Sequence, residues 1–433
     1  MLASHNWLMQ LSGLSLGPAE VAKRLTAAGL EVESLRACGQ GLQNVVVAEV
    51  RGLRPHPSRD KLRLVTVFDG EREQEVVCGA PNVPPPGGLV AFARLGASLP
   101  NGMRIEERKL GGVVSCGMIC SEKELDIGAD EDGILVIEPA ASCRPGAQLT
   151  EALSLVDTIY EIGLTPNRPD CLGHVGIARE LCVLLETPFA FPTAAPVQRV
   201  HAQNSGLLAP AVSTFSLAQA LPRSATATLA VPSDLPAVQV QISAPERCPR
   251  YGAALVTGCT VGASPFSLRY RLHTLGLRAI SNVVDATNLV LLGFGHPIHA
   301  FDLHKLRGAR IEVRMARAGE SMQTLDAQAR TLTDDDLLIC DAQGPVALAG
   351  VMGGANSEIS AQTQHVLIEC AYFEPRGVRR TSKRLGLHTD SSHRFERGVD
   401  PEAVRPVLAY AASLIAQLSG GVVLPEALDL HPQ

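Results

Sequence analysis

A chain of 433 residues is too long for one hydrophobic core, and its length predicts roughly three domains. Hydrophobic residues make up 46% of the chain and charged residues 19%, which excludes a disordered or fibrous protein. The net charge of -6 excludes a general attraction to nucleic acid, so RNA binding would have to come from local basic patches.

The sequence shows neither a membrane span nor a secretory signal. No stretch reaches the roughly 18 to 20 uninterrupted apolar residues of a membrane helix, and the start, MLASHNWLMQLSG, lacks a basic first region. Eleven cysteines are scattered from Cys38 to Cys370, without the setting of a disulfide framework. We therefore expect a cytoplasmic protein with no membrane partner, whose cysteines are mostly small buried apolar residues.

The first part of the chain predicts a β-rich unit between two helical segments. Residues 18–33 place Pro18 in a first helical turn and Gly29 at the stop, which predicts an amphipathic helix followed by a strand. Residues 44–138 contain five strand-like runs, VVVAEV, LRLVTVF, EVVCGA, LVAFARLGA and GILVIE, which suggest a small barrel with the OB-fold among the candidates. Helical spacing returns at 173–187. The two helical segments are predicted to form one small domain that the barrel interrupts.

The second part of the chain predicts an α+β domain. Residues 191–236 are rich in Pro, Ala, Ser and Thr, which predicts a linker or a poorly ordered insertion. Residues 238–400 mix strand-like runs with a helical stretch at 266–276. The pattern PEAVRPVLAYAASLIAQLSGG predicts a last helix that ends at Gly420. The fold class is therefore an α+β multidomain protein.

A basic segment, HPSRDKLRLV, lies where a loop enters a predicted strand of the barrel. Such groups at a barrel rim can contact phosphates, and an ordinary basic turn is the alternative. Residues 39–150 resemble the tRNA-binding barrel of several synthetases in this segment, in CGAPNV at 78–83 and in the run SCGMICSEKELDIG from Ser115. The candidate tRNA contacts are His56, Arg59, Lys61 and Arg63.

Two groups of possible metal ligands do not complete a familiar site. Cys116 and Cys120 are four residues apart, but no second Cys or His pair follows nearby. His296, His299 and His304 lie among apolar residues without a Cys or carboxylate at a familiar spacing. We therefore predict no metal site in this chain.

Three features of the last domain carry possible chemistry. Glu369 lies in the apolar run VLIECAYF, where a carboxylate is costly unless a partner satisfies it, and an outward-facing strand position is the alternative. The glycines of ALAGVMGGANSE would let a ligand approach the backbone, although a tight hairpin is the commoner reason for them. Residues 376–397 contain seven Arg or Lys and two acidic residues. This basic segment could be a solvated face of the domain or a binding site for an RNA 3′ end. The candidate RNA contacts there are Arg379, Arg380, Lys383 and Arg384.

Two further segments resemble one family. LTAAGLEVE at 25–33 and LTPNRPDCLGHVGIARE at 164–180 closely resemble bacterial phenylalanyl-tRNA synthetase β subunits, and the runs of the last domain occur in the same order in that subunit's editing domain. The resemblance implies an OB-fold barrel inserted in a small α/β N-terminal domain, followed by an α+β editing domain. The implied boundaries are 1–38 with 151–190 for the split N-terminal domain, 39–150 for the tRNA-binding OB-fold, 191–236 for a linker, 237–405 for the editing domain and 406–433 for a C-terminal helix and truncated linker.

The editing domain of that family hydrolyses tyrosine wrongly attached to phenylalanine tRNA. An apolar pocket rejects a substrate that merely adds a hydroxyl by only about a hundredfold, so a second site has to correct the error. The resemblance implies that Glu369 accepts the hydrogen bond of the tyrosine phenol beside the Gly353 backbone, and that His299 positions water or the terminal ribose. It also implies the other pocket positions, which are Pro297, Arg278, Thr389 and Ser391, the last at a position where the family commonly has Ala.

The resemblance also implies partners. These are tRNA(Phe) and the α subunit, in the α2β2 assembly of the family, with aminoacylation carried by the α subunit. No class-defining ATP motif occurs here, so no cofactor is expected in this chain, and Mg²⁺ and ATP are expected only for the complete synthetase. The alternative is a non-enzymatic tRNA-binding or scaffold paralogue, against which the intact set of His299, Glu369 and Thr389 argues.

Overall fold

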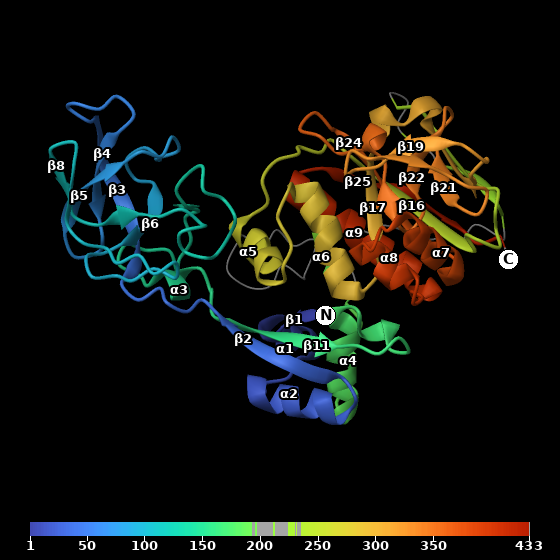
Figure 1. The fold of residues 1–433 in the computed structure, drawn as a ribbon, viewed down its shortest axis with the longest axis horizontal. Helices are drawn as coiled ribbons and strands as arrows, with labels where there is room; N and C mark the ends of the chain where they lie inside the picture. The colour runs from blue at the N-terminus through green and yellow to red at the C-terminus, as the bar shows by residue number, and fades with distance from the viewer. Residues whose placement is uncertain (193–194, 197–210, 213–223, 230, 232–234, 433) are drawn as a thin grey trace.

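The computed structural model describes residues 1–192, 195–196, 211–212, 224–229, 231 and 235–432. Figure 1 shows a β-rich unit at one end, a small unit that contains the N-terminus, and a larger unit of helices and sheets. This mixture of helices and sheets confirms the predicted α+β class. Among the described residues, the helices are too short or too polar to cross a bilayer.

The small unit is built on an antiparallel sheet in the order β1-β11-β2. Ser4 accepts a hydrogen bond from the Trp7 backbone N–H and so caps the first helix, which ends at Gly13 with φ 68°. The helices predicted at Pro18 and at 173–187 are confirmed. The elements are β1 (Leu2–Ser4), α1 (His5–Ser12), α2 (Pro18–Ala27), β2 (Glu31–Cys38), β11 (Asp157–Gly163) and α4 (His174–Leu184).

The β-rich unit lies between β2 and β11 in the chain, and all five predicted strands are present in its sheet, whose order is β10-β6-β3-β4-β5. The sheet is nearly closed, because β9 pairs with β6 while the Ser115 hydroxyl and the Cys116 N–H bond to Val77 and Glu75 on β5. The elements are β3 (Val45–Pro55), β4 (Arg63–Phe68), β5 (Glu73–Cys78), β6 (Leu89–Ala93), β7 (Arg108–Leu110), β8 (Val113–Ser115), β9 (Met118–Ile119), β10 (Val136–Ile137) and α3 (Leu149–Ala152).

The large unit contains two sheets. The first is antiparallel, in the order β17-β24-β16-β25, and the second has the order β14-β15-β18-β21-β22-β23. The strands are β14 (Thr226–Leu229), β15 (Val238–Ile242), β16 (Arg250–Thr257), β17 (Ile298–Asp302), β18 (Arg310–Met315), β19 (Ser321–Gln323), β20 (Ala329–Thr331), β21 (Leu337–Cys340), β22 (Pro345–Leu348), β23 (Met352–Gly353), β24 (His365–Tyr372) and β25 (Val422–Leu430). The helices are α5 (Phe266–Thr274), α6 (Asn282–Phe294), α7 (Pro375–Leu385), α8 (Asp390–Phe395) and α9 (Val404–Ser419).

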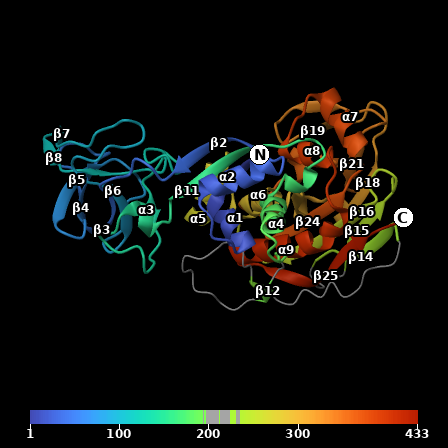
Figure 2. The same cartoon turned by 90° about the horizontal axis from the view of Figure 1, so that it is seen from below.

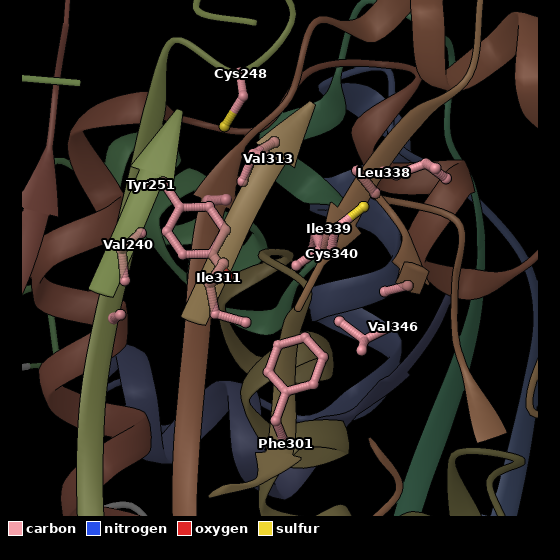
Figure 3. Close-up of a cluster of buried hydrophobic side chains, with 14 of the residues drawn as sticks. Val240, Cys248, Tyr251, Phe301, Ile311, Val313, Leu338, Ile339, Cys340 and Val346 are labelled. Atoms are coloured by element: carbon pink, nitrogen blue, oxygen red, sulfur yellow. The ribbon is translucent and has the colours of Figure 1, made fainter. Parts of the chain in front are cut away.

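Each face of the first sheet is buried against a different layer. One face packs on α5, α6 and α9 through side chains such as Ile368 and Cys370. The other face packs on the second sheet, and Figure 3 shows the rings of Tyr251 and Phe301 beside Ile311 in this layer. Alternate residues of β24 therefore face opposite cores, which decides where its charged residue points.

The small unit and the β-rich unit are both attached to the large unit. The His174 ring accepts a hydrogen bond from the Ser4 N–H at 2.9 Å and contacts the Leu292 carbonyl of α6 at 2.8 Å. Figure 2 shows α4 against α6. On the other side, Tyr270 of α5 donates to the Leu155 carbonyl, and its ring belongs to the core of the β-rich unit.

The structure corrects the boundary expected at 405 and part of the expected linker. Residues 406–433 were assigned to a helix and a truncated linker, but β25 pairs with β16 in the first sheet, so this segment completes the large unit. Most of residues 191–236 lie outside the described residues, apart from the short parallel pair β12 (Ala195–Pro196) and β13 (Ala211–Val212) and from β14, which pairs with β15. Sequence composition could not reveal these pairings because they join distant segments.

The cysteines follow the sequence prediction. All eleven are unpaired, and all except Cys116 are buried. Burial raises the pKa of the Cys120 thiol, among others, so these thiols stay protonated and apolar.

Candidate functional site

The register of β17 and β24 places two of the predicted pocket residues side by side. His299 is paired with Glu369, and Glu369 is paired on its other side with Ala253 of β16. Directly paired residues have Cβ atoms about 5 Å apart, so the three side chains form a row. Because Leu367 and Ala371 on the same face of β24 contribute to the core between the sheets, Glu369 also faces that layer.

Glu369 is an acidic side chain in an apolar interior. It is 6% exposed, and burial raises the pKa of its carboxyl to about 8. Among the described residues, no hydrogen-bond donor reaches this carboxyl, and its close electrostatic neighbours are Cys248, Tyr251 and Cys370. A carboxyl buried without a partner is costly, and its protonated form is favoured at neutral pH. The outward-facing alternative for this position is therefore wrong.

The His299 ring packs against Gly353 of β23. A Cβ atom on Gly353 would lie 2.6 Å from His299 Cε1 and 3.0 Å from Leu325 Cδ1, so the ring occupies the space that a side chain would need. Burial lowers the pKa of His299 to about 4, which keeps the ring neutral at pH 7. Its buried Nε2 has no hydrogen-bond partner within the described chain, so a substrate or water can bond there.

Thr389 and Ser391 hold the glycine turn that precedes β23. The Thr389 hydroxyl donates to the Val351 carbonyl at 2.8 Å, and the Ser391 hydroxyl donates to the Gly350 carbonyl at 3.1 Å. Thr389 also caps α8, since its hydroxyl accepts a hydrogen bond from the Ser392 N–H. These two residues are therefore tied to Gly353 through the backbone, and Ser391 uses its hydroxyl for this contact.

A cleft of about 370 Å³ lies between the small unit and the large unit. Thr389 lines it, together with Met1, Leu277 and Arg394. Arg278 follows Leu277 and is exposed. Pro297 is buried at the start of β17, two residues before His299. Thr389 thus lines the cleft and holds the turn before β23, but neither Glu369 nor His299 lines this cleft.

We expect Gly353→Ala to destabilise the large unit by about 1–3 kcal/mol, because the added methyl overlaps the His299 ring. The measurement is the urea midpoint of unfolding. Gly262→Ala is the matched control, since a Cβ atom on Gly262 meets no atom within 4 Å. Equal midpoints for both variants would show that the ring is not packed on Gly353.

The structure separates the predicted contacts on the barrel into two groups. His56 is 5% exposed and contacts the Leu110 carbonyl at 3.1 Å, so its ring supports the β7-β8 hairpin and is not available to RNA. Arg59, Lys61 and Arg63 are exposed, as the prediction requires. The loop from His56 lies against that hairpin, which adds two exposed cations that sequence reasoning missed, Arg108 and Lys109.

The basic residues of α7 also divide into two groups. Arg380 binds Asp335 through two contacts of 2.7 and 3.1 Å, and Arg384 pairs with the buried carboxylate of Asp336. Both cations are therefore neutralised within the protein. The remaining predicted contacts on this helix, Arg379 and Lys383, are exposed.

The described residues contain no group of three or more His, Cys, Asp or Glu side chains arranged to hold a metal ion. His296, one of the predicted cluster, is buried and contacts the Ala371 carbonyl at 3.0 Å. His304 instead packs its ring against His365. The three histidines therefore serve separate contacts.

Comparisons with known proteins agree with this division into units. Residues 45–148 match a family model described as a putative tRNA binding domain, and residues 247–420 match the B3/4 domain. The whole chain is 45% identical over 433 residues to the phenylalanine–tRNA ligase beta subunit of Geobacter metallireducens, and 46% identical over 430 residues to that of Anaeromyxobacter dehalogenans. The alignments cover 100% and 99% of this chain but 50% and 49% of those proteins, so the chain spans about half the length of the curated relatives it matches.

A solved structure also aligns with most of the chain. It is an N-terminal fragment of the phenylalanyl-tRNA synthetase beta subunit from Pyrococcus horikoshii, at 11% identity, with 98% of this chain and 74% of that chain covered. The TM-score is 0.31.

Proposed function

We propose that this homologue of phenylalanine–tRNA ligase beta subunits binds tRNA(Phe) and hydrolyses tyrosine that has been wrongly esterified to it. The similarity along the whole chain agrees with the motifs that first pointed to this family. The tRNA-binding and B3/4 matches supply the two parts that such an activity needs. Since the chain spans only about half of its relatives, the activity is proposed for the described units alone.

The buried carboxyl of Glu369 is the observation that carries this proposal. An apolar layer with one carboxyl paired to the small residue Ala253, and with Gly353 against the neighbouring His299 ring, suits an aromatic ring that ends in a hydroxyl. The phenol of tyrosine donates a hydrogen bond to Glu369, whereas phenylalanine leaves the carboxyl unpaired. A site built around such a bond discriminates strongly against the analogue without the hydroxyl.

Ester hydrolysis is the reaction. Water attacks the carbonyl carbon of the ester, the bond to the ribose oxygen breaks, and that oxygen takes up a proton to give tyrosine and uncharged tRNA. His299 accepts a hydrogen bond from the attacking water or from the ribose hydroxyl at Nε2. Because the pKa of His299 is about 4, the neutral ring can orient the water. It is too weak a base to keep a proton taken from that water at pH 7. Thr389, Ser391 and Pro297 position the surrounding backbone, and Arg278 lies free to meet the tRNA end.

The same proposal assigns the domains. Residues 39–150 form an OB-fold that binds tRNA through Arg59, Lys61 and Arg63 and is inserted in the N-terminal domain of residues 1–38 and 151–190. The editing domain includes β14, which starts at Thr226, and β25, in place of the boundaries at 237 and 405. An α subunit is the proposed partner for aminoacylation in the cytoplasm, and ATP and Mg²⁺ serve that complete assembly.

The test follows the loss of each ester from tRNA(Phe) charged with tyrosine or with phenylalanine. The purified chain should release tyrosine selectively. Glu369→Ala should slow release of tyrosine roughly 10- to 100-fold, the value of one hydrogen bond to a buried carboxyl. Release of phenylalanine should stay at its low level in both proteins.

Glu426→Ala is the matched control, because it removes an exposed carboxylate from the same sheet. It should release tyrosine as fast as the unchanged chain does. If the unchanged chain releases neither amino acid, the editing proposal is overturned and a tRNA-binding or scaffold role takes its place.

A further inference from the structure

Helix α7 carries two sets of basic side chains, one paired with carboxylates and one unpaired in the described part of the chain. Glu374 caps its start, because the Glu374 carboxylate accepts hydrogen bonds from two backbone N–H groups of the first turn, and the helix ends before Gly386 with φ 67°. Val378 is buried against the large unit, and the Thr381 hydroxyl donates to Asp336. The backbone of α7 is thus fixed at both ends and along its inner face, so its outer side chains have a defined placement.

One set of cations on α7 is already used. Arg380 and Arg384 are one helical turn apart and pair with Asp335 and Asp336, which follow one another in the loop before β21. Arg380 lowers the pKa of the Asp335 carboxyl, with help from Arg247, which pairs with the same carboxylate at 3.2 Å, so this carboxylate is charged at any physiological pH. These ion pairs neutralise Arg380 and Arg384, and they fasten α7 to the second sheet.

The second set is free in the described part of the chain. Arg376, Arg379 and Lys383 are exposed, and no ion pair within the described residues reaches them. Their spacing of three and four residues places them along one side of the helix, over about 10 Å. In a chain whose net charge is -6, this row concentrates three positive charges on one rigid surface.

We infer that this row, formed by Arg376, Arg379 and Lys383, binds the phosphate backbone of an RNA strand whose end enters the candidate pocket. The inference rests on the proposed function and adds a surface to it. Helix α7 connects β24, which carries Glu369, directly to Thr389 at the start of α8 (Figure 1). An RNA strand that reaches the site along α7 passes this row.

Salt-dependent binding tests the inference. The variant Arg376→Gln/Arg379→Gln/Lys383→Gln should weaken binding of tRNA(Phe) roughly 10- to 100-fold at low salt. Each phosphate contact contributes about 0.7 to 0.9 to the slope of log affinity against log salt concentration, so the slope should fall by about 2 to 3. The matched control, Arg380→Gln/Asp335→Asn, removes a paired charge from the adjacent face and should leave the slope unchanged.

The outcomes separate this inference from the proposed hydrolysis. If the triple variant keeps the slope of the unchanged chain, the row does not bind phosphates, whether or not tyrosine is released. If polyglutamate competes as strongly as tRNA at equal charge concentration, the RNA assignment is overturned. If the slope falls while the unchanged chain releases no tyrosine, the row stands and the editing proposal fails. Circular dichroism of the triple variant should match that of the unchanged chain.

Discussion

Asp429→Ala should lower the free energy of unfolding by about 3–5 kcal/mol, because it leaves a buried guanidinium without its buried counterion. Arg250 on β16 donates to the two carboxylate oxygens of Asp429 on β25 at 2.9 and 2.8 Å. Both side chains are 6% exposed. The pair therefore joins the last strand to the middle of the first sheet in a place that water hardly reaches. Urea unfolding followed by circular dichroism measures the loss.

Glu402→Ala provides the matched control for this pair. Glu402 contacts the same guanidinium at 3.1 Å, but its side chain is 78% exposed. Exposed ion pairs contribute about 0–1 kcal/mol, so this variant should unfold close to the unchanged protein. Similar losses in the two variants would mean that burial does not set the strength of the contact.

This ion pair also shows what sequence patterns leave out. Alternating and helical patterns predicted the five strands of the barrel and the helices at Pro18, at 173–187 and at 266–276, because these elements depend on neighbouring residues. Nothing local marks residues 422–430 as a partner of residues 250–257. Such pairings are decided by the packing of the whole unit, so the boundary expected at 405 was wrong.

The candidate site was predictable to a similar extent. Glu369 stood out as a carboxylate in an apolar strand, and the structure places it in the interior. The row with His299 required the register between β17 and β24, which the sequence does not contain. His56 was misleading for a physical reason, since a basic loop does not show which of its side chains turns inward. Arg376 was overlooked because the sequence does not show which basic residues of this segment pair with Asp335 and Asp336. Only the structure separates these paired cations from the unpaired ones.

Glu369→Gln should make the protein more stable at alkaline pH and change little near pH 4.5. Burial raises the pKa of Glu369 from 4.5 to about 8. Between pH 4.5 and about pH 8, the folded protein therefore holds a proton on this carboxyl that the unfolded chain has lost. Stability must then fall as pH rises through this window. At about 1.4 kcal/mol per pKa unit, the loss above pH 8 amounts to roughly 5 kcal/mol, and glutamine avoids it.

The buried histidines change the stability in the opposite direction with pH. Their effect is the same in the unchanged protein and in Glu369→Gln, so it cancels when the two are compared. Burial lowers the pKa of His299 and His296 to about 4 and that of His174 to about 3, so their contribution is present above pH 6.5 and is lost as pH falls. Both proteins carry these rings, hence the difference between their urea midpoints from pH 5 to pH 9 isolates the carboxyl. A difference that does not change with pH would mean that Glu369 is already ionised in the folded protein. In that case the carboxyl has a partner, and the apolar pocket proposed for the tyrosine ring does not exist in this form.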